Sequence, residues 1–478
     1  MKVAIVHYHL EPGGVTRVIE NTLLGWKEAG TEIETVVLSG RSYSGSVIPK
    51  VEIVQRLDYT TPEISPKPEL LTEAMEIAAE RALGGKPDIW HVHNHSLGKN
   101  PSLPLALSLL ARKGAYMLLH PHDFAEDGRP SNFKALKNSY FETYPSSERI
   151  HYAALNHRDY SYLSEMLTGF SSRAHLLANA ISNHNKSESE KTHQSLPEEL
   201  FLYPVRAVRR KNLGELALLS LLHPEKHFAN SLGPTNPNFN SEFEGWKQFA
   251  QGLNLNLTYA LGENCTASFP EMVAHAKAIV STSVAEGFGL GFLEPWIFGK
   301  GLCGRDIPEI TSDFSKLGIQ LNHLYERSEV SLDLLENQQS LKDSITLSLK
   351  AIYDYYEMEM PQNAIEEAFQ SIVSDGLLDF GRLNEDFQKE ILLNLRKSPE
   401  QLEQIRRRIP LEVPTYDEII RNQKAIQIRF SQKEYGNKLY NIYKEILANE
   451  DHRLDFAQGK KLLNAFLSPQ RLNLLRTD

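Results

Sequence analysis

The sequence predicts an α/β protein with two domains, each built around a mostly parallel sheet. The chain has 478 residues, which is too long for a single hydrophobic core. Short apolar runs alternate with helical patterns in two successive series, and a polar stretch at residues 182–199 separates the two series. We therefore expect two tandem α/β halves joined by this polar connection.

The expected strands are short runs rich in β-branched and aromatic residues. The first run, KVAIVHY, ends at the break EPGG, and the helical pattern that follows stops at Gly30. Further strands of the first half are expected at residues 33–39, 88–93, 115–120, 149–156 and 174–181. Those of the second half are expected at residues 200–206, 255–261 and 278–284.

The last third of the chain has a different pattern. From about residue 312 to 427 it is helical and acidic, and no strand series is predicted there. Residues 430–447 then form an amphipathic helix. We expect domains at residues 1–190 and 191–428, the second with a helical extension, and closing helices at residues 429–478.

Composition excludes several classes of function. The formal charge is −10, and the basic residues are scattered, which argues against nucleic-acid binding. Two cysteines suit a reducing compartment. The N-terminal apolar run is too short for a signal peptide, and no stretch approaches the roughly 20 apolar residues of a membrane span. We expect a soluble, cytoplasmic protein, and nothing in the sequence requires membrane association.

The stretch AEGFGLGFLEP follows a predicted strand. Gly287 and Gly289 let the backbone approach a ligand, and a helix is expected to begin at Leu290. Amides at such a helix start attract anions, whereas Glu286 and Glu294 accept hydrogen bonds from hydroxyls. A molecule with both phosphates and hydroxyls, such as a nucleotide sugar, fits this combination. A glycine-rich loop with one capping and one solvated glutamate fits the spacing equally well.

A basic loop, VRAVRRKN, follows the first strand of the second half. Arg206 and Lys211 flank its turn. A planar guanidinium and a compact ammonium together suit a diphosphate. Taken alone, the loop is as readily explained by an ordinary basic surface.

Histidines gather at two strand ends of the first half. Their spacing admits a metal-dependent hydrolase, although packing or solvation at a strand end is the simpler explanation for His91 and His95. His122 and Asp123 at a strand exit are better placed to line a cleft. The residues concerned are His91, His93, His95, His120, His122 and Asp123. The EPGG turn lacks the third glycine of a dinucleotide fingerprint, so a nicotinamide enzyme is poorly supported.

Together these motifs resemble the retaining glycosyltransferases of family 4, which have the GT-B architecture. The likeness covers about residues 1–310 and the helix from Phe430. Its most specific part is EGFGLGFLE, with two glutamates separated by seven residues. VRAVRRKN resembles the family's Arg–Lys phosphate motif, HYHLEPGG its N-terminal glycine loop, and HPHDF the position of its acceptor-side histidine.

The resemblance implies two Rossmann-like domains that face each other across a cleft. It also implies an extra helical segment before the closing helix, which would cross back to the N-terminal domain. The donor would be a nucleotide sugar, the acceptor a sugar, glycan or lipid-linked sugar, and no cofactor or metal would be needed. The implied catalytic residues are His122, Arg206, Lys211 and Glu286; the donor-binding residues are Gly14, Gly287, Phe288, Gly289, Leu290 and Glu294; the acceptor-side residues are Gly13, His93 and Asp123.

The sequence departs from the family in three places and leaves two alternatives open. GKGLCGRDIPE stands where the family more usually has a Gly-x-Pro-Val-Val run. Pro295 follows Glu294, where a proline should bend a helix, and residues 312–427 exceed the typical length. The first alternative is a metal-dependent hydrolase that uses His91, His93 and either His120 or His122. The second is a catalytically silent nucleotide-sugar-binding protein. The sequence makes no prediction of the oligomeric state.

Overall fold

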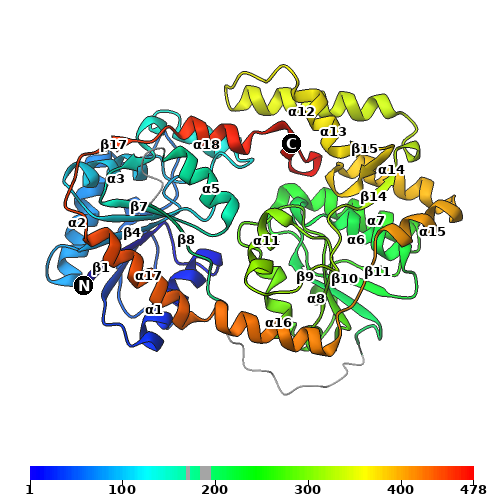
Figure 1. Ribbon diagram of the computed structural model, residues 1–478, viewed down its shortest axis with the longest axis horizontal. Coiled ribbons are helices and arrows are strands. Elements are labelled where there is room, and N and C mark those ends of the chain that lie inside the picture. The colour runs from blue at the N-terminus through cyan, green and yellow to red at the C-terminus, as the bar shows by residue number, and fades with distance from the viewer. Residues whose placement is uncertain (168–172, 183–194, 478) are drawn as a thin grey trace. The chain divides into compact units, whose positions relative to one another are not determined.

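The computed structural model describes residues 1–167, 173–182 and 195–477. The chain forms two compact units (Figure 1). Unit 1 comprises residues 1–182, 355–357 and 428–468, and unit 2 comprises residues 183–354, 358–427 and 469–478. The predicted domain boundary at 190/191 and most of the polar connection lie outside the described residues.

Unit 1 contains a seven-stranded parallel sheet in the order β3-β2-β1-β4-β5-β7-β8. Its strands are β1 (Lys2–His7), β2 (Glu34–Ser39), β3 (Val51–Ile53), β4 (Ile89–His93), β5 (Met117–His120), β7 (Ile150–Ala154) and β8 (Ala174–Leu176). β3 was not predicted, because three residues are too few to leave a periodic signal.

Helices cover both faces of this sheet. Alternate residues of β1 point to opposite faces, so Ala4 and Val6 join one apolar cluster while Val3 and Ile5 join the other. The first cluster includes side chains of α2 (Pro68–Leu83), α3 (Ser102–Arg112), α5 (His157–Met166) and α18 (Gly459–Phe466). The second includes side chains of α1 (Gly14–Ala29) and α17 (Gln432–Leu447). Both faces are therefore buried, as parallel sheets require.

The contact between α1 and α17 is unusually close. A Cβ atom at Gly25 would lie 2.3 Å from the carbonyl oxygen of Gln432, and one at Gly436 would lie 2.6 Å from the carbonyl carbon of Gly25. Just before α17, the carbonyl of Phe430 accepts a hydrogen bond from the amide of Ile181 (2.8 Å). Residues near 181 and 430 therefore lie side by side within unit 1.

Unit 2 contains a five-stranded parallel sheet in the order β11-β10-β9-β12-β13. Its strands are β9 (Leu200–Arg206), β10 (His227–Leu232), β11 (Leu257–Thr258), β12 (Ala278–Ser281) and β13 (Leu302–Gly304). Neither β10 nor β13 was predicted. β10 contains the buried polar residues Asn230 and Ser231, which bond to backbone carbonyls and hide the strand pattern.

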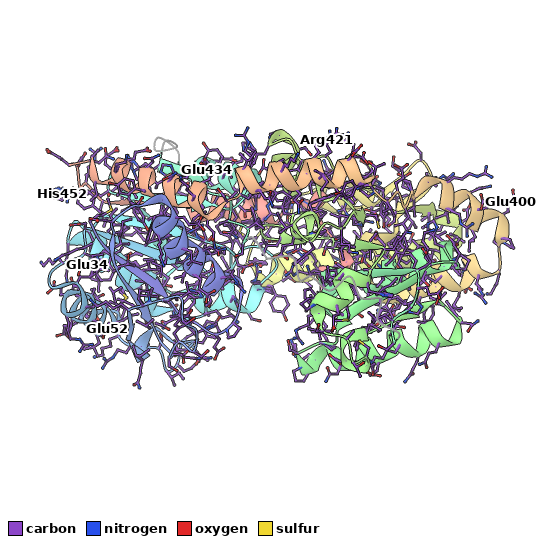
Figure 2. The ribbon with its side chains drawn as sticks, turned by 90° about the horizontal axis from the view of Figure 1, so that it is seen from below. Glu34, Glu52, Glu400, Arg421, Glu434 and His452 are labelled. Carbon is purple, nitrogen blue, oxygen red and sulfur yellow. The ribbon has the colours of Figure 1, made fainter. Side chains whose placement is uncertain are left out.

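The segment after residue 312 is mainly helical but not entirely so. A three-stranded antiparallel sheet, in the order β14-β16-β15, corrects the prediction that it lacks strands. The strands are β14 (Glu329–Ser331), β15 (Val373–Ser374) and β16 (Leu377–Asp379), and the main helices are α12 (Gln338–Tyr355), α13 (Ala364–Ile372), α14 (Glu385–Arg396), α15 (Pro399–Arg408) and α16 (Tyr416–Arg429). Strands of two or three residues leave no readable alternation. Figure 2 shows Glu400 on α15 and Arg421 on α16, both exposed at the surface.

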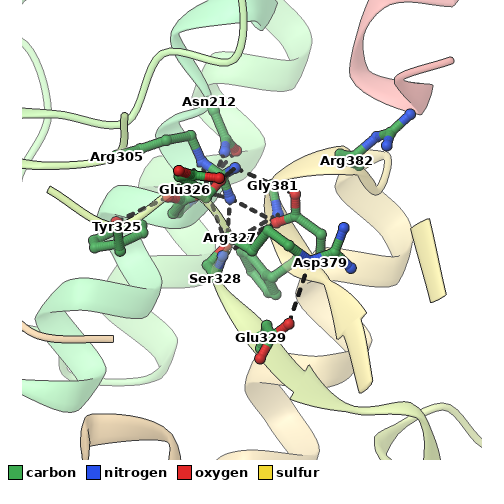
Figure 3. Close-up of polar contacts among 12 residues, drawn as sticks. Asn212, Arg305, Tyr325, Glu326, Arg327, Ser328, Glu329, Asp379, Gly381 and Arg382 are labelled. Carbon is green, nitrogen blue, oxygen red and sulfur yellow. Dashed lines mark hydrogen bonds and ion pairs between the residues drawn. The ribbon is translucent and has the colours of Figure 1, made fainter. Parts of the chain in front are cut away.

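A buried ionic network ties this small sheet to the parallel sheet of unit 2 (Figure 3). Arg305, just after β13, donates to Glu215 in the first turn of α6 (Leu213–Leu222) at 2.8 Å and to Asp379 of β16 at 2.7 Å. Tyr325 and Ser328 complete the hydrogen bonds of Glu215 and Arg305 (2.8 and 2.6 Å). Burial alone would raise the pKa of Asp379, but Arg305 outweighs it and holds the pKa below its usual value.

Of the described helices, none combines the length and the apolar character that crossing a bilayer requires.

Candidate functional site

Two loops of unit 2 lie together at the carboxyl ends of β9 and β12. The hydroxyl of Thr282 donates to the carbonyl of Lys211 (2.9 Å), and the amide of Val284 donates to the carbonyl of Arg210 (3.0 Å). Ligands of open parallel sheets bind outside this edge. The two predicted phosphate and sugar motifs, which lie some eighty positions apart in the chain, thus share one edge of one sheet.

Glu286 occupies the centre of this group. One of its carboxylate oxygens pairs with the Lys211 ammonium and accepts from the Ser283 hydroxyl (2.6 Å), and the other accepts from Arg210 (2.8 Å). Only 13% of the side chain is exposed. Burial alone would raise the pKa of Glu286, but Lys211 and Arg210 outweigh it and hold the pKa below its usual value. The carboxylate is therefore ionised at neutral pH.

Arg206 is placed at the end of β9, close to the loop after β10. Its guanidinium donates to the carbonyl of Gly233 (3.3 Å), and the amide of Gly233 donates to Glu263 (2.8 Å). Arg206 is exposed. It is the predicted cation most open to an incoming ligand.

The backbone after Glu286 differs from the prediction of one helix that begins at Leu290. A 3₁₀ turn spans Leu290–Phe292, and the short helix α10 (Glu294–Ile297) follows. Glu294 therefore begins a helix rather than lying one turn inside it. The reason is Pro295, which lacks an amide hydrogen and is tolerated only in the first turn.

The predicted glycines have different structural reasons. Gly289 has φ +90°, and a Cβ there would lie 2.9 Å from Ile310, so the fold itself requires glycine. Gly287 and the buried Phe288 precede it in the turn. In unit 1, Gly13 precedes α1 in an extended conformation, and a Cβ on Gly14 would meet nothing within 4 Å. The fold does not require glycine at position 14, and the space there is open to a ligand.

In unit 1, the structure brings two of the predicted acceptor-side residues, His93 and Asp123, together with His122, which was predicted to be catalytic. Nδ1 of His93 lies 2.8 Å from Nε2 of His122. The amides of His122 and Asp123 both donate to the side-chain oxygen of Asn94 (2.6 and 3.1 Å). The carboxylate of Asp123 pairs with Arg129 (2.6 Å). Asn94 thus fixes the loop after β5 to the loop after β4.

The histidines of β4 and β5 are buried in the sheet rather than solvated. His91 pairs with the hydroxyl of Tyr443 (2.8 Å) and with His120 (3.2 Å), and His95 is fully buried between aromatic rings. Burial lowers the pKa of His91, His95 and His122 to about 3 in each case. All three imidazoles are therefore neutral at physiological pH.

Sequence reasoning missed three polar residues of these loops. Arg210 and Ser283 both hold Glu286, and Asn94 joins the two histidine loops. Arg210 lies in the basic run VRAVRRKN, and its place there was the signal that could have identified it as a partner of Glu286. Asn94 adopts a positive φ of 56°, which no pattern in the sequence announces.

Comparisons with known proteins agree on the fold. No protein-family model matches the chain. A curated mannosylglucosyl-3-phosphoglycerate synthase from Petrotoga mobilis is 24% identical over 518 residues, covering 98% of each chain. Sucrose-phosphate synthase from Thermosynechococcus elongatus is 12% identical with a TM-score of 0.54, covering 94% of this chain and 99% of that one.

A second solved structure, Anabaena HepE in complex with UDP and glucose, is 11% identical with a TM-score of 0.54, covering 93% and 99% of the two chains. The catalytic domain of starch synthase IV from Arabidopsis thaliana, bound to ADP and acarbose, is 12% identical with a TM-score of 0.51, covering 94% and 99%. These likenesses confirm the predicted two-domain α/β fold class, GT-B.

Proposed function

We propose that the protein is a retaining glycosyltransferase that moves a sugar from a nucleotide-diphosphate sugar to an acceptor. The observation that carries the proposal is the grouping of Glu286 with Lys211 and Arg210 where β9 and β12 end. It combines fixed cations for phosphates with an ionised acceptor for sugar hydroxyls.

The cations would act on the leaving group. Arg206 and Lys211 neutralise the diphosphate, helped by the backbone amides of residues 287–290, and this fixed charge stabilises the departing phosphate. Such a site needs no divalent ion at the diphosphate, so we propose metal-independent transfer. Retention would follow from a front-face reaction in which the leaving phosphate takes the proton of the acceptor hydroxyl.

We propose the remaining donor contacts from the same placement of the diphosphate beside Arg206 and Lys211. Glu286 accepts hydrogen bonds from the sugar hydroxyls, and Glu294, at the start of α10, accepts them from the ribose. The open space beside Gly14 at the start of α1 suits the approach of a phosphate, because the helix N-terminus favours negative charge.

His122 and Asp123 would face the acceptor from unit 1. The Petrotoga relative, matched along nearly its whole length, is a mannosylglucosyl-3-phosphoglycerate synthase. We therefore propose a phosphorylated glycosyl acid as the first acceptor to test, with a mannosyl nucleotide among the donors. Lys99, whose ammonium lies 5.5 Å from the ring centroid of Tyr59, is the cation we propose for the acid group, because Arg41 over the same ring is already paired with Glu11 and Asp58 (2.6 and 2.8 Å).

Calorimetric titration with UDP, GDP and ADP tests the donor site. At least one nucleotide diphosphate should bind. Glu294→Ala should weaken this binding because the ribose contact is lost, whereas Arg206→Ala should mainly lower turnover because the departing charge is less stabilised. Absence of binding by all three nucleotides, or negligible effects of both substitutions, would contradict the proposal. Binding without turnover of any donor would instead favour a nucleotide-sugar-binding protein.

A further inference from the structure

Three buried histidines of β4 and β5 converge within unit 1. His91, His93 and His120 are each fully buried. Each offers one ring nitrogen, and the three nitrogens lie within 4.8 Å of one another. Buried polar atoms normally find partners, so this grouping of imidazoles in a sheet core calls for a physical reason.

Hydrogen bonds orient two of the three rings. Nδ1 of His91 lies 2.8 Å from the hydroxyl of Tyr443, and Nδ1 of His93 lies 2.8 Å from Nε2 of His122. Nε2 of His93 is therefore left for another ligand, whereas Nε2 of His91 faces Nδ1 of His120. This is how proteins orient metal-binding histidines, whose second nitrogen donates to a neighbouring acceptor.

The distances between the rings suit a common ion. Nε2 of His91 lies 3.2 Å from Nδ1 of His120. Two imidazole nitrogens bound to one tetrahedral zinc at about 2.0–2.1 Å are roughly 3.4 Å apart. The three nitrogens lie within 4.8 Å of one another, so the rings would move closer together for all three to bond one ion.

The cluster also has unmet hydrogen-bonding capacity. Among the described residues, Nε2 of His93 and Nε2 of His120 have no hydrogen-bond partner although both atoms are buried. The buried Nδ1 of His7 lacks one as well, and its ring lies next to that of His93, with 6.3 Å between ring centroids. A bound cation would satisfy the lone pair of His93, whereas His120 can turn only one of its two ring nitrogens to the same ion.

We propose that His91, His93 and His120 bind a transition-metal ion of the zinc class, with His7 as the candidate fourth ligand. Neutral imidazoles suit zinc, cobalt, nickel and copper, whereas magnesium and calcium prefer oxygen ligands, which this set does not contain. Four protein ligands would make the site closed and structural. The ion would take no part at the diphosphate, so the site is compatible with metal-independent transfer.

The ion would also set the proton of His122. With Nε2 of His93 bound to the metal, its Nδ1 carries the hydrogen and donates to Nε2 of His122. His122 then keeps its own proton on Nδ1. The metal would thus fix the tautomer of His122 through the hydrogen bond from His93, just as neighbouring groups fix the tautomers of metal-binding histidines.

Metal loading of the untagged full-length protein tests the inference. The protein is unfolded with a chelator, refolded, dialysed against Zn²⁺ or Co²⁺, and analysed by mass spectrometry for bound metal. One ion per chain is expected, together with the visible absorption bands of tetrahedral cobalt. His93→Gln and His120→Gln should each lower the affinity at least about tenfold, and Tyr443→Phe, which leaves the ligands intact, should lower it about 10–100-fold.

Two matched controls separate this site from general histidine binding. His95→Gln alters a buried neighbour outside the three-residue group and should bind normally. His151→Gln alters the other possible group, His151, His175 and Glu445, and should also bind normally. A wild-type protein that binds neither ion, a His93→Gln/His120→Gln double variant that keeps it, an unchanged affinity in Tyr443→Phe, or loss of the ion in either control would each overturn the proposal.

Circular dichroism of each refolded variant, with and without Zn²⁺, shows whether a loss of binding reflects unfolding. Zn²⁺ should raise the Tm of the wild type and of His95→Gln but not that of His93→Gln. These measurements contain no nucleotide. The metal proposal can therefore be contradicted while the proposed donor site is upheld, and the donor site can be contradicted while the metal proposal is upheld.

Discussion

At the scale of single residues, Glu286 combines two opposing electrostatic effects. Two cations keep it ionised despite its burial, and it in turn offsets their positive charge. A diphosphate at this loop would meet the cations and the carboxylate together. Binding of the anion and orientation of a sugar therefore make opposite demands on the charge of this one side chain.

Replacing Glu286 by glutamine should separate these demands. Glu286→Gln keeps the shape but removes a negative charge, so the best-binding nucleotide diphosphate should bind as tightly as before or up to about tenfold more tightly. Turnover should fall by about 10–100-fold, because a charged hydrogen bond to the sugar is lost. Calorimetry and donor-turnover assays measure the two effects. Glu244→Gln, which alters an exposed pair with Lys247, should change neither; weaker binding at unchanged turnover would contradict the assignment.

At the scale of elements, the Arg305 network holds the small antiparallel sheet against the start of α6. Its three charged side chains are each at most 5% exposed. One buried arginine serves two carboxylates from different elements, so loss of either acid leaves the charge poorly compensated. The segment that sequence patterns could not place is therefore anchored by charge as well as by apolar packing.

Asp379→Asn should destabilise unit 2 by about 3–5 kcal/mol, because a buried ion pair is broken while its partner stays charged. Unit 2 contains Trp246 and Trp296, so urea unfolding followed by fluorescence in a Trp26→Phe/Trp90→Phe background reports on this unit. The control is Glu329→Gln, whose half-exposed pair with Arg327 in the same region should contribute less than about 1 kcal/mol. Equal losses in the two variants would mean that the buried network adds nothing beyond a surface pair.

At the scale of the whole molecule, unit 1 is made mainly from two stretches far apart in the sequence, with residues 355–357 as a short third one. α17 covers the apolar face of α1, and the amide of Ile181 bonds to the carbonyl of Phe430. The chain thus leaves unit 1 and returns to it at neighbouring positions. Residues 1–182 alone would expose the face of α1 that includes Val18 and Trp26.

A single chain that joins Ser182 to Ile428 through a short glycine–serine linker and ends at residue 468 should therefore fold without unit 2. Its far-ultraviolet circular dichroism and cooperative thermal unfolding should be those of an α/β domain, whereas residues 1–182 alone should aggregate or remain unfolded. The two outcomes are compared by size-exclusion chromatography and circular dichroism. Stable folding of the shorter fragment would show that α17 is dispensable.

Much of the architecture was predictable because most strands are continuous apolar runs. The strand β10 was not predicted, because its buried Asn230 and Ser231 bond to backbone carbonyls and interrupt the apolar pattern. The shared edge of Lys211 and Glu286 followed from their positions at strand exits. The start of α10 at Glu294 and the role of Asn94 did not follow, because both depend on local backbone geometry that no periodicity encodes.

The return of the chain to unit 1 affects the order of events during synthesis. A ribosome would deliver the whole parallel sheet of unit 1 before the partner of α1 exists, since α17 emerges more than two hundred residues later. Unit 2 lies almost entirely in between and could fold as it emerges. Unit 1, whose residues are translated first, would then be the last unit to be completed. Nascent chains that have not yet reached residue 447 would be the ones most in need of a chaperone.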